Sequence, residues 1–433
     1  MSKVLSVCVV LSFLALLAKA ASAQDYTVID LGTLGGKSSS AFAINTNGKI
    51  TGSAATAAGH QHAFLYQNGT MQDLGTFGGT SSAGLAINIK GQITGYADTA
   101  DEIEHAFMYD GSMTDLGTLN GGPSRGRGIN DAGRITGWSD TQGFIYSGGA
   151  MTQIPNPPGL SDESEILASA INNSGQVTGF VNEVYDNYVY DEQPILFDGT
   201  ATKILGSTEV DHDSQPAAIN DVGVIVGEGV FNGNYAVLLK NGHFKNLGVP
   251  PGYARSAAFG INAVSDVVGD TYKTDTGPEH AMFYNSLLGM LDLNTSISSN
   301  SGWTLKSARG INVHGQIVGE GVIQGHKHAY LLKPNALGIL RKYIFQLAKG
   351  IEGCIQCKLT LDSIDRVLPP DATGLTAAQR KHAMQEMNGL NVLVTGYANA
   401  GVVSKPNALL VRNEANEALR DLSTVKTGTT GAN

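Results

Sequence analysis

Two pairs of histidines have the residue type and spacing that could bind a metal ion. His60 and His62 stand in "GHQHAFLYQNG" at 59–69, and His326 and His328 stand in "GHKHAYLLKPN" at 325–335. Side chains two positions apart on a β-strand point to the same face of the sheet. Neutral imidazoles are good ligands for transition metals. These four histidines are therefore a candidate metal site.

A second candidate is an aromatic and acidic segment, "YDNYVYDEQ" at 185–193. Aromatic rings of this kind stack on sugars, and carboxylate oxygens coordinate calcium. A solvated surface loop is the alternative interpretation. The candidate ligand-binding residues are Tyr185, Asp186, Tyr188, Tyr190 and Asp191.

Other motifs give weaker indications of a chemical site. "CIQC" could form a disulfide between Cys354 and Cys357, but Lys358 stands where a haem-binding motif needs histidine. "LGTLGGKSSS" at 31–40 has Leu31 where a phosphate-binding loop needs its first glycine. No serine, histidine and carboxylate arrangement compels an enzyme interpretation. We therefore predict no catalytic residue and no cofactor, and we leave open whether the protein is an enzyme.

An internal repeat organises most of the chain. "AFAINTNGKITG" at 41–52 returns as "GLAINIKGQITG", "GRGINDAGRITG", "ASAINNSGQVTG", "PAAINDVGVIVG", "AFGINAVSDVVG" and "ARGINVHGQIVG". Seven copies of this segment cannot be a coincidence, so the fold must be built from repeated units. The spacings between their asparagines are 43, 42, 42, 48, 42 and 50 residues, for Asn45, Asn88, Asn130, Asn172, Asn220, Asn262 and Asn312.

Each unit reads as four short strands. The "AIN…G" segment predicts a hairpin, with asparagine and glycine in the turn; Ser265 replaces that glycine in the sixth unit and should be slightly strained. A second glycine never varies, which implies close approach of another backbone. These invariant glycines are Gly52, Gly95, Gly137, Gly179, Gly227, Gly269 and Gly319.

The histidine of "HAFLY" belongs to this repeat. His62, His105, His280 and His328 occupy one repeat position, so we interpret them as structural residues that connect strands. Only His60 and His326 are left unexplained by the repeat.

Four strands and 42–50 residues per unit predict an all-β fold, a β-propeller of four-stranded blades. The chain opens with "YTVIDLG" at 26–32, and the seventh unit lacks such a strand, so residues 26–32 should complete the last blade. Seven blades are favoured. An open β-solenoid is an alternative, and "NGLNVLVTGYANAGVVSKPNALLV" in the tail could be a worn eighth unit.

The ends of the chain predict export and an appendage. Residues 1–23 have the positive start, apolar run and small-residue cleavage site of a signal peptide. The propeller should span 24–335, followed by a mixed helix and strand appendage at 336–422 and a disordered tail at 423–433. The formal net charge of −10 is dispersed, so we expect no nucleic-acid partner and no membrane association after signal cleavage.

The motifs "HAFLY", "DLGTLGG" and "AIN..GQITG" across about residues 26–335 resemble the HAF-repeat family of extracellular proteins. The resemblance implies export and a repeat fold, and no activity. We expect a secreted, periplasmic or extracellular binding module, whose ligand could be a glycan or an envelope protein. The alternatives are a polysaccharide-active enzyme (a lyase or a glycosidase) and a purely structural surface protein.

Overall fold

The computed structural model describes residues 26–335 apart from 162, 186–187, 207–210, 231–232, 274–279 and 287, and the side chains of 184–191 and 211–213 are also not described. The predicted signal peptide at 1–23, the predicted appendage at 336–422 with Cys354 and Cys357, and the predicted tail at 423–433 lie outside the described residues. No helix among the residues described is both long and apolar enough to span a membrane.

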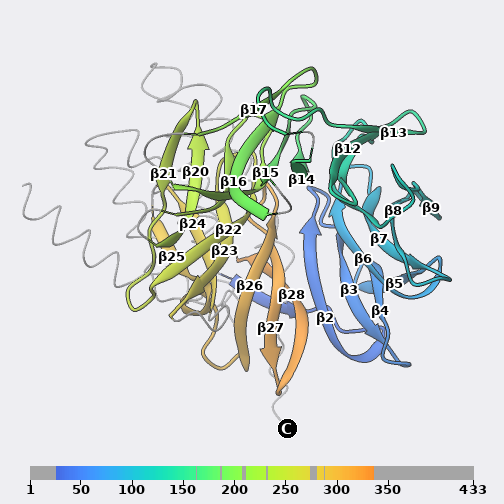
Figure 1. The fold of residues 1–433 in the computed structure, drawn as a ribbon. Helices are drawn as coiled ribbons and strands as arrows, with labels where there is room; N and C mark the ends of the chain where they lie inside the picture. The colour runs from blue at the N-terminus through green and yellow to red at the C-terminus, as the bar shows by residue number, and fades with distance from the viewer. Residues whose placement is uncertain are drawn as a thin grey trace, which may run out of the picture. The chain divides into compact units, whose positions relative to one another are not determined.

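Seven four-stranded sheets form a β-propeller (Figure 1). The predicted fold and the predicted number of blades are confirmed. Blade 1 contains β2 (Gly35–Ile44), β3 (Ile50–Thr56), β4 (Gln61–Gln67) and β5 (Thr70–Gly75). Blade 2 contains β6 (Gly78–Ile87), β7 (Ile93–Thr99), β8 (Glu104–Tyr109) and β9 (Met113–Asp115). Blade 3 contains β10 (Ser124–Ile129), β11 (Ile135–Ser139), β12 (Gln142–Ser147) and β13 (Ala150–Gln153).

The remaining blades follow the same order. Blade 4 contains β14 (Glu165–Ile171), β15 (Val177–Tyr185), β16 (Tyr188–Phe197) and β17 (Thr202–Ile204). Blade 5 contains β18 (Asp211–Ile219), β19 (Ile225–Val230), β20 (Asn234–Lys240) and β21 (His243–Asn246). Blade 6 contains β22 (Arg255–Ile261), β23 (Val267–Tyr272), β24 (His280–Asn285) and β25 (Gly289–Asp292). Blade 7 contains β26 (Trp303–Ile311), β27 (Ile317–Ile323), β28 (His326–Pro334) and β1 (Tyr26–Asp30). A single 3-10 turn, Leu293–Ser296, is the one helical element in the described part.

The first strand of every blade lies on the inside of the ring. These first strands contact one another in an unbroken circle: β2 with β6, β6 with β10, β10 with β14, β14 with β18, β18 with β22, β22 with β26, and β26 with β2. Blades 1 and 7 lie side by side in Figure 1, which is where the chain closes the circle. The predicted closing strand is β1, which lies at the outer edge of blade 7 beside β28.

The repeated asparagine links each blade to the next. Its side-chain Nδ2 donates to the backbone carbonyl of the next blade's asparagine, at 2.9 Å from Asn45 to Asn88 and 3.1 Å from Asn312 back to Asn45. The five links between them are Asn88 to Asn130, Asn130 to Asn172, Asn172 to Asn220, Asn220 to Asn262 and Asn262 to Asn312. Because the seventh link returns to the first asparagine, these hydrogen bonds form a closed ring, which we call the asparagine ring.

The invariant glycines face a β-bulge in the first strand. In blade 1 the bulge falls between Ala41 and Ala43, and Gly52 is paired with Ala41. A Cβ added to Gly52 would collide with the backbone carbonyl of Ser40, and every other invariant glycine faces a carbonyl in the same way. The glycine is therefore required by the bulge, which brings a second backbone too close for any side chain.

A serine of the next blade connects the "HAF" and "DLG" motifs. The Ser82 hydroxyl donates to the Gly75 carbonyl and accepts from the Ala63 backbone N–H. Ser124 and Ser256 do the same between blades 2 and 3 and between blades 5 and 6, and Ser39 does so between blades 7 and 1. Together with the fully buried "HAF" aromatics, such as Phe64 and Phe107, this contact explains why the two motifs recur together.

Candidate functional site

The repeated histidines pair with the repeated aspartates of the adjacent outer strand. His62 Nδ1 lies 2.9 Å from Asp73, and His105 Nδ1 lies 2.9 Å from Asp115. The closing blade repeats this pair with His328 and Asp30, again at 2.9 Å. In three blades the aspartate also accepts the backbone N–H of the glycine two residues later. The partner is thus a carboxylate on the adjacent outer strand of the same blade.

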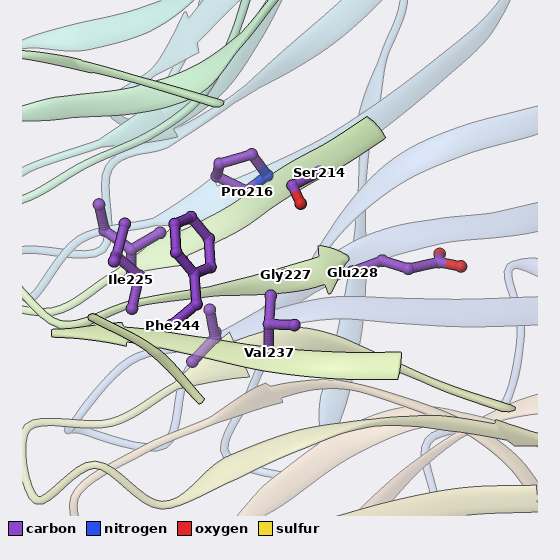
Figure 2. A pocket seen from close by; sticks show the side chains of 9 residues that line it. Ser214, Pro216, Ile225, Gly227, Glu228, Val237 and Phe244 are labelled. Carbon is purple, nitrogen blue, oxygen red and sulfur yellow. The ribbon is translucent and has the colours of Figure 1, made fainter. Parts of the chain in front are cut away.

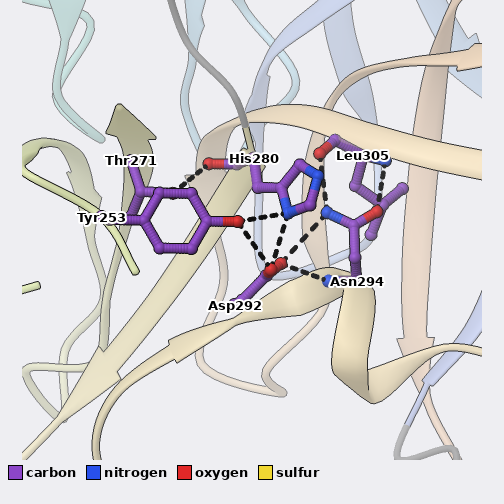
Figure 3. A network of polar contacts seen from close by, with 6 residues as sticks. All are labelled: Tyr253, Thr271, His280, Asp292, Asn294 and Leu305. Carbon is purple, nitrogen blue, oxygen red and sulfur yellow. Dashed lines mark hydrogen bonds and ion pairs between the residues drawn. The ribbon is translucent and has the colours of Figure 1, made fainter. Parts of the chain in front are cut away.

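Blade 6 carries an extended version of this pair (Figure 3). His280 Nδ1 lies 2.6 Å from Asp292, and the Tyr253 hydroxyl lies 2.5 Å from the same ring nitrogen and donates to Asp292 at 3.0 Å. Burial would raise the pKa of Asp292, but the hydrogen bonds from His280 and Asn294 outweigh burial and lower it. Asn294 also bonds the backbone of Leu305 in blade 7. The network therefore joins two blades, and it elaborates a contact that three other blades make for structural reasons.

The two histidines outside the repeat do not complete a metal site. Among the described residues, no three His, Cys, Asp or Glu side chains come together as metal ligands. The rings of His326 and His328 stack with centroids 6.4 Å apart, and His60 is exposed in the turn before β4. The Nδ1 atoms of His62 and His328 already face aspartates. The geometry gives the four-histidine hypothesis no support.

The aromatic and acidic segment forms the end of a hairpin. The backbone of Tyr185 pairs with that of Tyr188 at the tip of β15 and β16. Asp186 and the side chains of Tyr185, Tyr188, Tyr190 and Asp191 lie outside the described part, so the segment remains a prediction from the sequence.

A small pocket lies inside blade 5 (Figure 2). Ile225, Val237 and Phe244 contribute apolar side chains to it, and Ser214 lies at its edge. Ser214 occupies the repeat position of Ser82, the serine that connects the "HAF" and "DLG" motifs of the preceding blade. Its hydroxyl, however, has no hydrogen-bond partner among the described residues. In blade 4, Pro194 replaces the alanine whose N–H would donate to it, and proline has no N–H. The pocket is thus a site where the repeat contact is lost.

The extra residue of each β-bulge forms a set that differs from blade to blade. Each is partly or fully exposed, although the residue before it is buried. We call these residues the axial set: Phe42, Leu85, Arg127, Ser169, Ala217, Phe259 and Arg309. Because they bulge from the innermost strands, they are placed to line the centre of the ring.

Electrostatic effects across the ring support that placement. Burial lowers the pKa of Arg127, and the charges of Arg125 and Arg309 lower it further. Arg127 belongs to blade 3 and Arg309 to blade 7, which are not neighbours. The Arg309 guanidinium also lies 4.0 Å from the centre of the Phe259 ring in blade 6. Together with their positions at the bulges of the innermost strands, these interactions indicate that Arg127, Arg309 and Phe259 face the same central space.

A buried carboxylate lies behind Arg309. Asp270 has 0% of its surface exposed, and neither of its oxygens makes a hydrogen bond of good geometry in the described part of the chain, although the Ser307 side chain and the Ala308 backbone lie close enough to lower its pKa. Burial raises its pKa to about 7, while the nearby charge of Arg309, whose Nη2 is 3.9 Å away, opposes the rise. Glu320 adds to the rise. Asp270 is therefore an acid that can be protonated near neutral pH, but it has no access to solvent.

Neither the axial set nor Asp270 was predicted from the sequence. The signal was available in the repeat strings, where "F", "L", "R", "S", "A", "F" and "R" precede the "AIN" or "GIN" triplet. Such variation between otherwise similar copies marks positions that the fold does not constrain.

Comparisons with known proteins concern the fold. No protein-family profile matches the chain, and no curated protein matches it in sequence. Among solved structures, YCF48 bound to D1 peptide is similar with 10% identity and a TM-score of 0.44, over 72% of this chain and 96% of that one. A Trypanosoma rangeli sialidase has 7% identity and a TM-score of 0.40, over 82% and 63%. The Aleuria aurantia lectin in complex with α-methyl-L-fucoside has 12% identity and a TM-score of 0.30, over 72% and 96%.

Proposed function

We propose that this protein is an exported HAF-repeat binding module, which holds an extracellular ligand, a carbohydrate, at the axial set. One observation carries the proposal. The asparagine ring and the invariant glycines are the same in every blade, whereas the seven axial residues include arginine, phenylalanine, leucine, serine and alanine. The fold does not restrict the residue type at these seven positions, and they lie together at the centre of the ring. Their side chains are therefore available to bind a ligand.

The test is a glycan-binding screen on the mature chain, run beside an activity assay on the same glycans. We expect binding of a defined glycan without turnover. A double substitution in the axial set, Phe42→Ala with Phe259→Ala, should weaken that binding, because aromatic rings supply most of the contact area in such sites. Absence of any ligand would favour the purely structural surface protein.

A polysaccharide-active enzyme is the second candidate. Its support is Asp270, whose pKa is raised mainly by burial and further by the nearby carboxylate of Glu320; burial of one carboxyl group beside another is also how glycosidases keep an acid protonated. Against it stands the complete burial of Asp270. Turnover in the assay that Asp270→Asn abolishes would establish the enzyme over the binding module.

A further inference from the structure

Arg127 is a cation without a partner. No ion pair or hydrogen bond of its side chain is found among the described residues. Arg125, by contrast, is paired with Glu104 and stacked 4.3 Å over the Tyr96 ring. Arg309 has Asp270 at 3.9 Å and Phe259 beneath it. Protein atoms crowd Arg127 closely enough to lower its pKa, yet solvent still reaches a large part of its surface. An accessible guanidinium has therefore been left with its hydrogen-bond donors free.

The neighbours of Arg127 make its position unfavourable in the free protein. Burial and two arginine charges act on it, and no carboxylate offsets them. Like charges that converge in a confined space repel each other, and the repulsion is removed when an anion binds between them. A guanidinium is suited to this role because its planar donors match the two oxygens of a carboxylate or the oxygens of a sulfate.

We propose that Arg127 and Arg309 form an anion site at the propeller axis, which binds the carboxylate or sulfate group of an acidic carbohydrate. This proposal rests on the proposed function and adds the chemical class of its ligand. Phe259, which already stacks with Arg309, offers an apolar surface next to the charge, as the face of a sugar ring requires. A uronic acid or a sulfated sugar combines these two features.

The net charge of the whole chain restricts the chemical class of the ligand further. The formal net charge is −10, and the axial set contains two cations and no acid. A densely charged polyanion such as nucleic acid would be repelled by the acidic exterior. An oligomer of a uronic acid carries one carboxylate per sugar, which is a lower charge density than that of duplex DNA, so it would be repelled less, and its charge at the axis would be compensated locally.

The experiment is isothermal titration calorimetry on the mature chain with three probes. The probes are inorganic sulfate, a galacturonate oligomer and the neutral galactose oligomer of the same length. We expect the galacturonate oligomer to bind more tightly than the neutral one, and sulfate to compete with it. The affinity for the acidic oligomer should fall by about tenfold or more in Arg127→Gln, because charge-assisted hydrogen bonds are lost, and Arg127→Lys should keep part of it.

Lys203→Gln is the matched control, since it removes the same charge from an exposed site on β17 and should leave the affinity unchanged. The melting temperature of each variant shows that it is folded. Equal binding of the acidic and neutral oligomers, or an unchanged affinity in Arg127→Gln, would overturn the anion site and leave the carbohydrate-binding function standing. Failure of the wild-type chain to bind any carbohydrate in the wider glycan screen would overturn both.

Discussion

The amide of the repeated asparagine provides two contacts that no other small side chain provides together. In blade 3, Asn130 Oδ1 accepts the Arg134 backbone N–H at 3.0 Å, which fixes its own turn. Its Nδ2 donates to the Asn172 carbonyl at 3.2 Å, which fixes the next blade. An aspartate could make only the first contact, because an ionised carboxylate has no donor. This explains why the repeat keeps asparagine in all seven copies.

Asn130→Ala should lower the free energy of unfolding by about 2–4 kcal/mol, because the buried Asn172 carbonyl and the part-buried Arg134 N–H each lose a partner. Urea denaturation of the chain that begins at residue 24 measures this loss. Asn130→Asp is the matched control: it keeps the turn contact but breaks the ring, so it isolates the link between blades. If both variants unfold like the wild type, the asparagine ring contributes nothing to stability.

Ser265 is the one residue other than glycine at its repeat position, and its φ of 64° lies in the left-handed region. Glycine adopts this conformation without the roughly 1–2 kcal/mol cost that a side chain brings. We expect Ser265→Gly to raise the free energy of unfolding by about 1 kcal/mol. The gain is limited because the Ser265 hydroxyl accepts a hydrogen bond from Asn220. Thermal unfolding would show it as a higher melting temperature, and a lower one would contradict the strain.

The sequence predicted these turns but not their partners. Asparagine and glycine at fixed spacing indicate a turn, because the reason for their choice is local. The carbonyl that receives the Asn130 amide is 42 residues away, and the aspartate that faces His105 is 10 residues away on another strand. Such partners depend on how strands and blades align in space, which the spacing of one motif does not contain.

At the scale of the strand, the β-bulge decides which residue is free to vary. It turns one side chain out of the sheet pattern, so that Arg127 and Arg309 face the axis while their neighbours are buried. The repeat strings contain this variation, but only the paired register shows that the variable position is the bulge. The candidate site was therefore missed where the chemistry depended on an irregularity in strand pairing.

The interface between blades 6 and 7 should make stability depend on pH. Burial raises the pKa of Asp270 from 3.8 to about 7. Between these values the native state holds a proton that the unfolded state has lost, so stability falls as the pH rises through this window. Asp270→Asn should therefore stabilise the protein at pH 8, by up to about 4 kcal/mol, and have little effect at pH 4. Urea denaturation at the two pH values tests this.

Asp292 provides a control because its effect on stability changes with pH in the opposite direction. Its pKa is lowered in the folded protein, so its contribution is present above the pKa of the unfolded chain and is lost as the pH falls. Asp292→Asn should accordingly destabilise the protein at pH 8. A pH dependence that Asp270→Asn leaves intact would show that Asp270 is not its source.

At the scale of the whole molecule, the phase of the repeat predicted how the ring closes. The repeat region begins with an outer strand and its seventh unit is one strand short, and β1 does lie in blade 7. What the phase could not supply is the second closure, in which Asn312 at one end of the repeat donates to Asn45 at the other. The ring is thus held at its seam both at the axis and at the outer edge.

The outer closure can be tested by comparing a chain that begins at residue 24 with one that begins at residue 33. The shorter chain loses the buried side chain of Leu31, its N–H bond to the Ala329 carbonyl and the Asp30 partner of His328. Burial of one leucine contributes about 1.5–3 kcal/mol and a hydrogen bond about 1 kcal/mol, so we expect a loss of at least about 3 kcal/mol. The edge of β28 would also be exposed, and exposed edges pair with other chains.

Thermal unfolding and size-exclusion chromatography with light scattering measure these two effects. Asp30→Asn in the longer chain separates the loss of the histidine pair from the loss of the strand, because it keeps Leu31 and the strand edge covered. It should cost less than the deletion and leave the protein monomeric. A shorter chain that melts at the same temperature and stays monomeric would mean that the asparagine ring and the other contacts between blades 1 and 7 close the propeller without β1.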